Sequence, residues 1–424
     1  MIALISGKEN VTFADLSKRV RSEAAGLSRE PVGQIGVLTA ASTIDFVVKF
    51  LAYLEAKRPL AVLAAGGAGA ESEARLALLK APCHPNTAVI LFTSGSTGTP
   101  KAVELSRANI DANTRGVISS LDFASAKEQT LYLPLSYSYG LLGQLLPALE
   151  CKIPTRLLEK LTDAKGLFDD GVASGMWSGV PAHWETILRS TDADNACNPK
   201  ITHVISAGAP MHVSLRERLR ERFPNAVLYN NYGQTEASPR LLCFSSRDPE
   251  FFLGGVGRPV GDAQVKLSKD GELEVRGSQI MLGYLGDQTA TTAKLSQGWL
   301  RTGDLAEISA SGLVSILGRR DELFNVGGER TSPSEIEIAL KSLPGITDAA
   351  VFVEDDPLYG SKISAFLVGP LLTKNQLMST LAGKLSLHKT PKDFYTLEKL
   401  PRSPSGKLLR AELGNLKTPE RRLR

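Results

Sequence analysis

The feature that most constrains the fold is a polar loop, residues 93–101, enclosed by two apolar segments. The loop reads Thr-Ser-Gly-Ser-Thr-Gly-Thr-Pro-Lys; residues 88–92 before it are apolar, and residues 101–105 after it alternate as in a strand. Glycines let backbone N–H groups approach an anion, while hydroxyls and a lysine add donors and charge, which favours a loop that holds the phosphates of a nucleoside triphosphate. A Walker loop needs Gly-Lys-Ser/Thr at the start of a helix, so the pattern predicts a strand–loop–strand arrangement instead. A flexible linker has a similar composition, but a linker rarely lies between two apolar strands.

The composition predicts two or more domains with large cores, because 42% of the 424 residues are hydrophobic. The net charge of +4 is small for this size and by itself argues neither for nor against a nucleic-acid partner. The four cysteines lie far apart with no Cys-x-x-Cys pair, which indicates free thiols in a reducing compartment rather than a structural zinc site. No segment reaches the ~18 apolar residues of a membrane span, and the N-terminus has no basic, apolar leader. We expect a soluble cytoplasmic protein with no nucleic-acid partner and no membrane span.

Helical and strand-like segments alternate through residues 11–245. This alternation predicts a large α/β domain whose parallel or mixed sheets are covered by helices. Thr12, Ser106 and Ser332 each precede a helical pattern and are placed to cap it.

The apolar period changes to two in the next part of the chain, where turns at 269–271 and 310–312 predict two hairpins and a small β-rich subdomain. The polar and flexible residues 318–321 mark the best domain boundary. We expect a large N-terminal domain over residues 1–318. A small α+β C-terminal domain would follow over residues 319–424.

Five further segments are weak signals singly and specific together. They are Ser206–Pro210, Tyr232–Glu236, Thr302–Asp304, Gly318–Asp321 and Pro401–Lys407. In this order behind the polar loop, they make the chain resemble the acyl-adenylate-forming superfamily of acyl- and aryl-CoA ligases, luciferases and nonribosomal adenylation domains. The resemblance covers nearly the whole chain and is greatest to a short CoA ligase. It implies that ATP, Mg²⁺ and a carboxylic acid give an acyl adenylate and pyrophosphate, after which coenzyme A or a carrier-protein pantetheine takes the acyl group.

The resemblance also implies a role for each matching residue. The β- and γ-phosphates would be held by Thr93, Ser94, Gly95, Ser96, Thr97, Gly98 and Lys101. Glu236 would hold Mg²⁺ and Thr235 would contact the α-phosphate. The adenine would be lined by Gly208, Ala209, Asn231 and Tyr232. Asp304, with Arg319 beside it, would accept from both ribose hydroxyls, since a carboxylate offers two acceptors.

In the C-terminal domain the resemblance implies moving parts. Lys407 would enter the site during adenylation, contact the carboxylate oxygen and the α-phosphate, and leave again on its Pro/Ser/Gly loop. Asp321 matches the hinge about which the domain would rotate. Gly327, Gly328 and Arg330 would then meet the pantetheine, where glycines leave room for a narrow tunnel.

The chain departs from the superfamily in three places. It is short, and the deficit falls between Leu63 and Cys83, so we expect an abbreviated N-terminal sheet there. Tyr137 stands where many CoA ligases have histidine; it would gate the thiol tunnel or, alternatively, be a core aromatic. Ser138 stands where amino-acid-activating relatives have aspartate, which argues against an α-amino acid substrate.

The acyl pocket implied by the resemblance is lined by small side chains and tyrosines, which favours an aryl or medium-chain acid. Its residues would be Tyr137, Ser138, Tyr139, Ser178, Gly179, Ala207, Ser238 and Arg240. Arg240 would either pair with a second acidic or polar group of the substrate or, as the sequence slightly favours, face solvent at the end of its segment.

Three hypotheses for the activity follow. The first is a carboxylate–CoA ligase, and the second is a stand-alone ligase that loads an acyl carrier protein through the same pantetheine arm. The third belongs to another class, an inactive protein that binds a nucleotide or an acyl adenylate. The presence of Lys101, Glu236, Asp304 and Lys407 argues against the third, because inactive relatives tend to lose such residues.

Overall fold

The computed structural model describes most of the chain. The described residues are 1–29, 34–65, 70–94, 100–161, 175–190, 200–326, 329–356, 360–369, 373–382, 384–402 and 408–423. Two compact units are present, and each is treated by itself. Unit 1 comprises residues 1–211, 216–266 and 274–302, and unit 2 comprises residues 212–215, 267–273 and 303–424.

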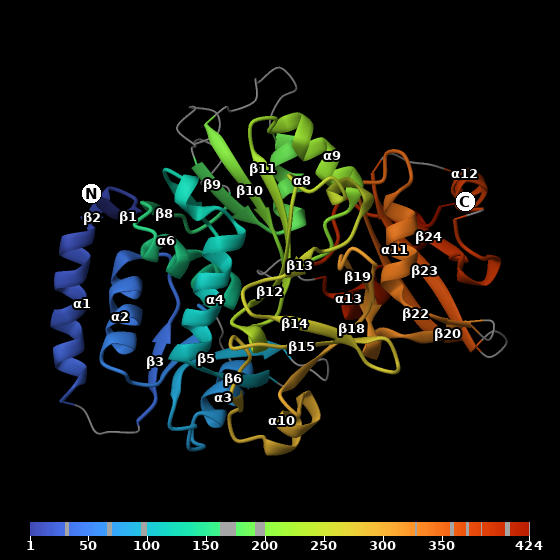
Figure 1. Cartoon of the computed structure of the whole chain (residues 1–424). Helices are drawn as coiled ribbons and strands as arrows, with labels where there is room; N and C mark the ends of the chain where they lie inside the picture. Colours follow the sequence, from blue (N-terminus) through green and yellow to red (C-terminus); the bar gives the residue numbers. More distant parts are fainter. Residues whose placement is uncertain are drawn as a thin grey trace. The chain divides into compact units, whose positions relative to one another are not determined.

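The larger sheet of unit 1 has nine described strands in the order β13-β12-β11-β10-β9-β7-β8-β1-β2 (Figure 1). Their bounds are β1 Ile2–Ser6, β2 Glu9–Thr12, β7 Gln129–Leu131, β8 Thr155–Leu157, β9 Gly175–Gly179, β10 Ile201–Ser206, β11 Val227–Gly233, β12 Arg240–Ser245 and β13 Arg258–Pro259. The strands from β1 through β8, β7, β9, β10 and β11 pair in parallel. Their carboxyl ends therefore meet at one edge of the sheet, the place where open α/β sheets bind ligands.

The second sheet of unit 1 has the order β16-β6-β5-β4-β3. Its strands are β3 Gly36–Thr39, β4 Leu60–Leu63, β5 Thr87–Ser94, β6 Pro100–Ser106 and β16 Gly283–Tyr284. The first three are parallel, whereas β5–β6 and β6–β16 are antiparallel. The sheet therefore joins the start of the chain to a strand near residue 284.

Helices cover these sheets as the alternating pattern predicts. They are α1 Phe13–Leu27, α2 Ile44–Glu55, α3 Ala70–Leu78, α4 Arg107–Ser120, α5 Ser138–Gly140, α6 Leu146–Glu150, α8 Pro181–Ser190, α9 Val213–Arg222 and α10 Gln288–Lys294, with a π-helical turn η2 at Leu141–Leu145. Helices α1 and α2 lie side by side (Figure 1). The predicted caps are confirmed, because the Thr12 hydroxyl accepts from Asp15 N and the Ser106 hydroxyl from Asn109 N, both at 3.1 Å.

Both predicted hairpins are present. Strand β14 (Gln264–Leu267) turns into β15 (Glu272–Arg276), and β18 (Trp299–Ile308) pairs antiparallel with β19 (Val314–Arg319). A short strand β17 (Leu295–Ser296) pairs with the start of β18. The part of the chain between the large sheets and the C-terminal module is thus β-rich.

The C-terminal part of unit 2 is an α+β module with a core of its own. Its described elements are β20 Phe324–Val326, β21 Glu329–Thr331, α11 Pro333–Lys341, β22 Asp348–Asp356, β23 Gly360–Val368, α12 Lys374–Leu381, β24 Asp393–Thr396 and α13 Arg410–Leu413. Ile336 and Leu340 of α11 pack in one buried cluster with Ile363 of β23 and Phe394 of β24. Ser332 caps α11 by accepting from Glu335 N at 3.2 Å, as the sequence predicts. The predicted fold class is confirmed.

Two local features differ from a reading of sequence alone. Strands β1 and β2 were not predicted from the sequence. They pair with each other, and β1 joins the sheet by pairing with β8, which is distant along the chain. In the shortened segment between Leu63 and Cys83 the described residues contain one helix, α3.

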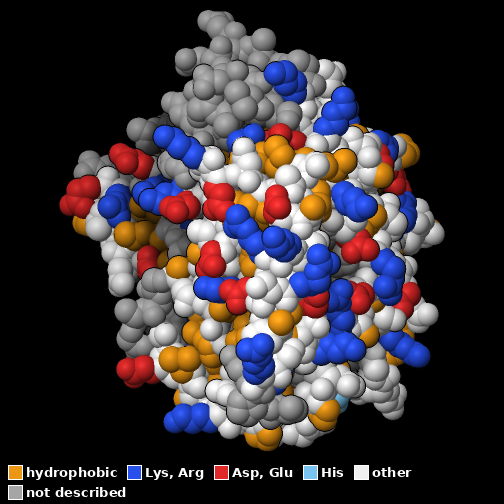
Figure 2. All heavy atoms as spheres, turned by 90° about the vertical axis from the view of Figure 1, so that its left-hand side faces the viewer, with side chains coloured by type: hydrophobic (Ala, Val, Ile, Leu, Met, Phe, Trp, Pro, Cys, Tyr) orange, Lys and Arg blue, Asp and Glu red, His pale blue; other side chains and the backbone are white. Residues whose placement is uncertain are grey.

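Among the described residues no helix combines the length and the apolar character needed to span a bilayer. On the face drawn in Figure 2, acidic and basic side chains are interspersed.

Candidate active site

The polar loop at 93–101 joins two antiparallel strands. Thr93 of β5 is the register partner of Lys101 in β6, and Ser94 that of Pro100. The predicted strand–loop–strand arrangement is thereby confirmed, and a Walker loop, which opens a helix, is excluded for this segment. The predicted phosphate ligands Gly95, Ser96, Thr97 and Gly98 lie outside the described residues. The structure fixes the two ends of the loop, where Thr93 and Lys101 face each other across the ladder.

One aromatic side chain, Tyr284, contacts both Lys101 and the predicted magnesium ligand, Glu236. Its Nζ lies 5.0 Å from the centre of the Tyr284 ring, and the Tyr284 hydroxyl donates to Glu236 Oε1 at 2.7 Å. Tyr284 and Glu236 are 5% and 8% exposed, so this contact chain is shielded from bulk solvent. Sequence analysis missed Tyr284, because only the pairing of β16 with β6, with Tyr284 opposite Val103, brings it to the loop.

The turn that carries Glu236 is held from several sides. A Cβ at Gly233 would lie 2.0 Å from the backbone oxygen of Pro239, so only glycine fits where β11 enters the turn. The Asn113 amide donates to the backbone oxygen of Arg240 at 2.8 Å, and Met281 N donates to that of Glu236 at 2.9 Å. A turn fixed in this way orients its carboxylate before any ligand binds.

Thr235 and Ser138 contact each other directly. Their hydroxyl oxygens are 3.0 Å apart, so the predicted α-phosphate ligand adjoins the predicted acyl pocket. Ser238, two residues after Glu236, is buried with φ of 63°, and its hydroxyl donates to Gln279 O at 2.9 Å. This hydrogen bond engages the Ser238 hydroxyl with the fold rather than leaving it free for a ligand.

The predicted adenine residues lie where parallel strands end. Gly208 and Ala209 follow β10, whereas Asn231 and Tyr232 are in the last part of β11, its neighbour in the sheet. Asn231 is 3% exposed, and neither its amide oxygen nor its amide nitrogen has a hydrogen-bond partner among the described residues. A buried amide with both functions open matches a ligand that offers a donor and an acceptor, as a purine edge does.

The predicted acyl-pocket residues Ser178, Gly179 and Ala207 share this edge. Gly179 of β9 is the register partner of Ser206 in β10, which places Ala207 just beyond it. The Tyr139 hydroxyl donates to the backbone oxygen of Gly179 at 3.3 Å. Burial raises the pKa of this phenol well above its ordinary value, so Tyr139 stays protonated and neutral.

Arg240 lies against Tyr139, with its Cζ 5.1 Å from the ring centre. The guanidinium is buried, at 2% exposure for the residue, so the sequence-based preference for a solvent-facing Arg240 is wrong. The reason is tertiary: β12 begins at Arg240, opposite Gly233 in the interior of the large sheet. Burial lowers the pKa of Arg240 from its ordinary value.

Two buried side chains of this region, Gln144 and Tyr132, were not predicted from the sequence. Ser178 Oγ donates to Gln144 Oε1 at 2.7 Å, and Gln144 belongs to the π-helical turn η2, a type of irregularity frequent at functional sites. A Cβ at Gly179 would lie 2.5 Å from the Tyr132 hydroxyl, so glycine is needed there to admit that ring. The predicted gate residue, Tyr137, is half-buried, with its N–H donating to Pro134 O at 3.3 Å. No local pattern distinguishes Gln144 or Tyr132 from ordinary core residues.

The predicted ribose and hinge residues form one cluster in unit 2. Asp304 and Arg319 are cross-strand partners in β18 and β19, with Oδ1 and Nη1 3.5 Å apart. Arg319 Nε donates to Asp321 Oδ1 at 3.0 Å. Gly327, Gly328 and Lys407 lie outside the described residues, and of Arg330 only the backbone is described.

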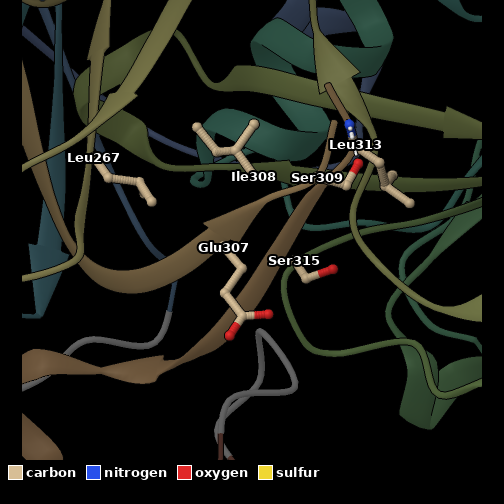
Figure 3. Close-up of a pocket in the computed structure, with 6 residues that line it drawn as sticks. All are labelled: Leu267, Glu307, Ile308, Ser309, Leu313 and Ser315. Carbon is tan, nitrogen blue, oxygen red and sulfur yellow. Dashed lines mark hydrogen bonds between the residues drawn. The ribbon is translucent and has the colours of Figure 1, made fainter. Parts of the chain in front are cut away.

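A separate hollow of about 320 Å³ on unit 2 contains none of the predicted site residues (Figure 3). It is lined by Leu267, Glu307, Ile308, Ser309, Leu313 and Ser315. Ser309 Oγ accepts from Leu313 N at 3.1 Å across the hairpin turn, so its hydroxyl has a local structural partner (Figure 3).

Comparison with known proteins identifies a family and several similar proteins. Residues 61–285 match the family described as AMP-binding enzyme, and residues 335–407 match the AMP-binding enzyme C-terminal domain. The chain is 29% identical over 350 residues to 2-succinylbenzoate–CoA ligase of Bacillus velezensis, which covers 79% of this chain and 70% of that protein. It is 32% identical over 356 residues to 4-coumarate–CoA ligase 1 of Solanum tuberosum, over 78% of this chain and 65% of that protein. The solved structure of o-succinylbenzoate coenzyme A synthetase from Bacillus subtilis with ATP and magnesium ion is similar at a TM-score of 0.82 and 25% identity, over 97% of this chain and 96% of that one.

Proposed function

This chain belongs to the AMP-binding enzyme family, and from that premise we propose that it is an ATP- and Mg²⁺-dependent carboxylate–CoA ligase. A carboxylate oxygen of the acid attacks the α-phosphorus of ATP, the bond from that phosphorus to the bridging oxygen breaks, and pyrophosphate leaves. The sulfur of coenzyme A, having lost its proton, then attacks the carbonyl carbon of the adenylate, and AMP leaves. The observation that carries the proposal is the contact chain from Lys101 through Tyr284 to Glu236, which links the phosphate loop to a buried carboxylate.

The phosphates would lie at the mouth of the β5–β6 hairpin. Thr93 and Lys101 stand opposite each other there, and the intervening residues 95–98 supply glycine N–H groups and hydroxyls. Charge on the departing pyrophosphate would then be met by hydrogen-bond donors and one cation, the groups that stabilise such a transition state when they are preorganised. Lys101 and the loop therefore act on the leaving group.

Glu236 fits a magnesium ion. Its carboxylate accepts one hydrogen bond, from the Tyr284 hydroxyl to Oε1, and no other described residue donates to the carboxylate oxygens. No group of three or more His, Cys, Asp or Glu side chains gathers for a metal among the described residues, so the ion would take its other ligands from phosphate oxygens and water, as Mg²⁺ usually does. When bound, it neutralises charge on the phosphates, while Tyr284 holds the carboxylate in place.

The residues proposed for the adenine and the α-phosphate belong to unit 1, and those proposed for the ribose and the hinge belong to unit 2. In unit 1 the open amide of Asn231 would meet the adenine edge, and Thr235 would contact the α-phosphate. In unit 2 Asp304 would accept from the ribose hydroxyls with Arg319 beside it. Residues 319–424 would rotate about Asp321, which brings Lys407 in for adenylation. A further rotation would then withdraw Lys407 and bring in the tunnel residues Gly327, Gly328 and Arg330 for thiol transfer.

The acid is an aryl or medium-chain acid in this proposal. Tyr139, Ser178, Gly179 and Ala207 support this size, because they gather at one sheet edge with little side-chain volume beyond the single ring. Carrier-protein pantetheine remains the alternative acceptor, since it presents the same arm to the tunnel. The proposed cellular location is the cytoplasm, on the ground that the described cysteines Cys83, Cys151 and Cys243 are unpaired.

The test is acid-dependent release of pyrophosphate with ATP and Mg²⁺ across an acid panel, with and without coenzyme A. Release with one acid, and a thioester product when coenzyme A is added, is the expected result. Adenylate that forms but does not react with coenzyme A would transfer the assignment to a carrier-protein ligase. ATP binding without turnover of any acid would point to the inactive nucleotide-binding protein instead.

A further inference from the structure

The Arg240 guanidinium is a buried cation with open donors. Its residue is 2% exposed, and among the described residues it forms no ion pair. Its Cζ lies 5.1 Å from the centre of the Tyr139 ring, whereas Nε and Nη2 have no hydrogen-bond partner in the described part of the chain. Burying a charge without a counter-charge is costly, and proteins keep such a group where a ligand completes it.

A second buried arginine shows what a structural guanidinium looks like in the same unit. Arg216, also 2% exposed, donates from Nε to Met211 O at 3.0 Å and from Nη2 to Gly255 O at 2.6 Å. Its Nη1 donates to the backbone oxygens of Phe251 and Gly254. Every nitrogen of Arg216 is thus satisfied by the fold, whereas Arg240 has two that are not.

The open nitrogens of Arg240 form a geometric pair. Nε–H and the adjacent Nη2–H project on the same side of the planar guanidinium, which is the fork that receives the two oxygens of a carboxylate. A single hydroxyl or carbonyl would leave one of the two donors open.

A second open donor belongs to the π-helical turn that passes this fork. An added Cβ at Gly143 would be 3.5 Å from Arg240 Nη2, so the π-helical turn runs directly past the guanidinium. The next residue, Gln144, is fully buried; its Oε1 accepts from Ser178, and its Nε2 has no partner among the described residues. Arg240 and Gln144 thus each carry an unsatisfied buried donor, and they contact the predicted pocket residues Tyr139 and Ser178, respectively. An acceptor with negative charge would satisfy both donors.

We propose that Arg240 and Gln144 form a subsite for a second carboxylate of the substrate, so that the acid activated by this protein is a dicarboxylic acid. The inference rests on the proposed ligase function. One carboxylate is adenylated beside Thr235 and Glu236, while the other is held in the interior by the Arg240 fork. The neutral Tyr139 phenol packs against the guanidinium without neutralising it, which leaves the positive charge for the ligand.

The experiment compares linear dicarboxylic acids from succinic to suberic acid, and phthalic, isophthalic and terephthalic acids, each with its half-amide. Binding of each acid to the full-length protein is measured by calorimetry in the absence of ATP, and adenylation by pyrophosphate release. The variants are Arg240→Met, which keeps the length without the charge, Arg240→Lys, which keeps the charge without the fork, and Arg216→Met as the buried-arginine control.

We expect the wild type to bind and adenylate at least one diacid on the order of 10 to 100 times better than its half-amide, the usual range for hydrogen bonds to a charged group. Arg240→Met should abolish that preference, and Arg240→Lys should retain a part of it. Arg240→Met should unfold at the same or a higher denaturant concentration than the wild type, because it removes an unpaired buried charge. Arg216→Met should lower stability and leave the diacid preference of the folded protein unchanged.

Equal binding of diacids and half-amides by the wild type, or a diacid preference that survives Arg240→Met, would overturn the subsite. Failure of the ligase function is recognised separately, as absence of pyrophosphate release with every acid. In that case the calorimetric preference for diacids, and its loss in Arg240→Met, still decides whether the subsite exists.

Discussion

The hydrogen bond from Tyr284 to Glu236 allows the proposed magnesium site to be tested with the loss of one oxygen atom. Tyr284→Phe removes the hydroxyl that donates to Glu236 Oε1 at 2.7 Å and keeps the ring that Lys101 Nζ faces at 5.0 Å. Both partners are buried, so water replaces the lost donor poorly. The variant therefore isolates the orientation of the carboxylate from the cation–π contact.

The expected magnitude follows from the charge of the acceptor. A hydrogen bond to a charged group contributes about 1.5–3 kcal/mol, which corresponds to about 10- to 150-fold in a rate or binding constant. We expect kcat/KM for acid-dependent pyrophosphate release to fall by a factor in this range, and the half-saturating Mg²⁺ concentration to rise. Tyr284→Leu, which also removes the ring under Lys101, should lose about a further 0.5–2 kcal/mol.

The assay is pyrophosphate release at a series of Mg²⁺ concentrations, with urea unfolding of each variant to exclude a loss of folded protein. Tyr229→Phe is the matched control, because the Tyr229 hydroxyl is buried in the same unit with no hydrogen-bond partner among the described residues. A Tyr284→Phe enzyme whose Mg²⁺ dependence equals that of the wild type and of the control would refute the role given to this contact. Equal loss in Tyr284→Phe and Tyr229→Phe would show a general effect of removing a buried hydroxyl.

Three further predictions concern other parts of the chain. Lys407→Ala should abolish adenylation while thiol transfer from a preformed adenylate persists, measured as two separate half-reactions; equal loss of both would contradict the assigned role. Gly233→Ala should lower the free energy of unfolding by more than about 2 kcal/mol in urea melts, because its Cβ would lie 2.0 Å from a backbone oxygen. Burial alone would raise the pKa of Asp348, but Lys341 and Arg402 hold this pKa below its ordinary value. The ionised carboxylate therefore stabilises the folded protein at pH values above the pKa of the unfolded state, and this stabilisation is lost as the pH falls through the pKa of the folded state. Asp348→Asn should therefore be destabilised at neutral pH, and its difference from the wild type should shrink below about pH 4 in unfolding measurements; a difference that does not vary with pH would exclude the charge as its cause.

Much of the fold could be predicted from the sequence because its signals are local. The helix caps at Thr12, Ser106 and Ser332 depend on a side chain and an N–H three residues later, and all three are present. The strand–loop–strand arrangement at 93–101 follows from apolar runs on either side of glycines and hydroxyls. The hairpins of β14–β15 and β18–β19 follow from an apolar period of two with a turn between. Each of these needs only neighbours along the chain.

The residues of the candidate site likewise fall into those found by a local motif and those brought in by tertiary packing. Local motifs predict which segments carry chemistry, because Lys101, Thr235 and Glu236 each stand in a recognisable motif. Tyr284 and Gln144 stand in none. Tyr284 reaches Glu236 because β16 adds to the edge of β6, and Gln144 meets Ser178 because η2 packs against β9.

Arg240 shows the difference most clearly. From the sequence it is an arginine at the end of a motif, where exposure is the ordinary expectation for a charged side chain. The large sheet places it inside, opposite Gly233, with a tyrosine ring against the guanidinium and two of its nitrogens without a partner among the described residues. The order of the elements and the motifs between them can be predicted from the sequence, since propensity and period are properties of adjacent residues. Which polar groups are buried without partners cannot be predicted in this way, because burial depends on segments that are distant along the chain and meet in the fold.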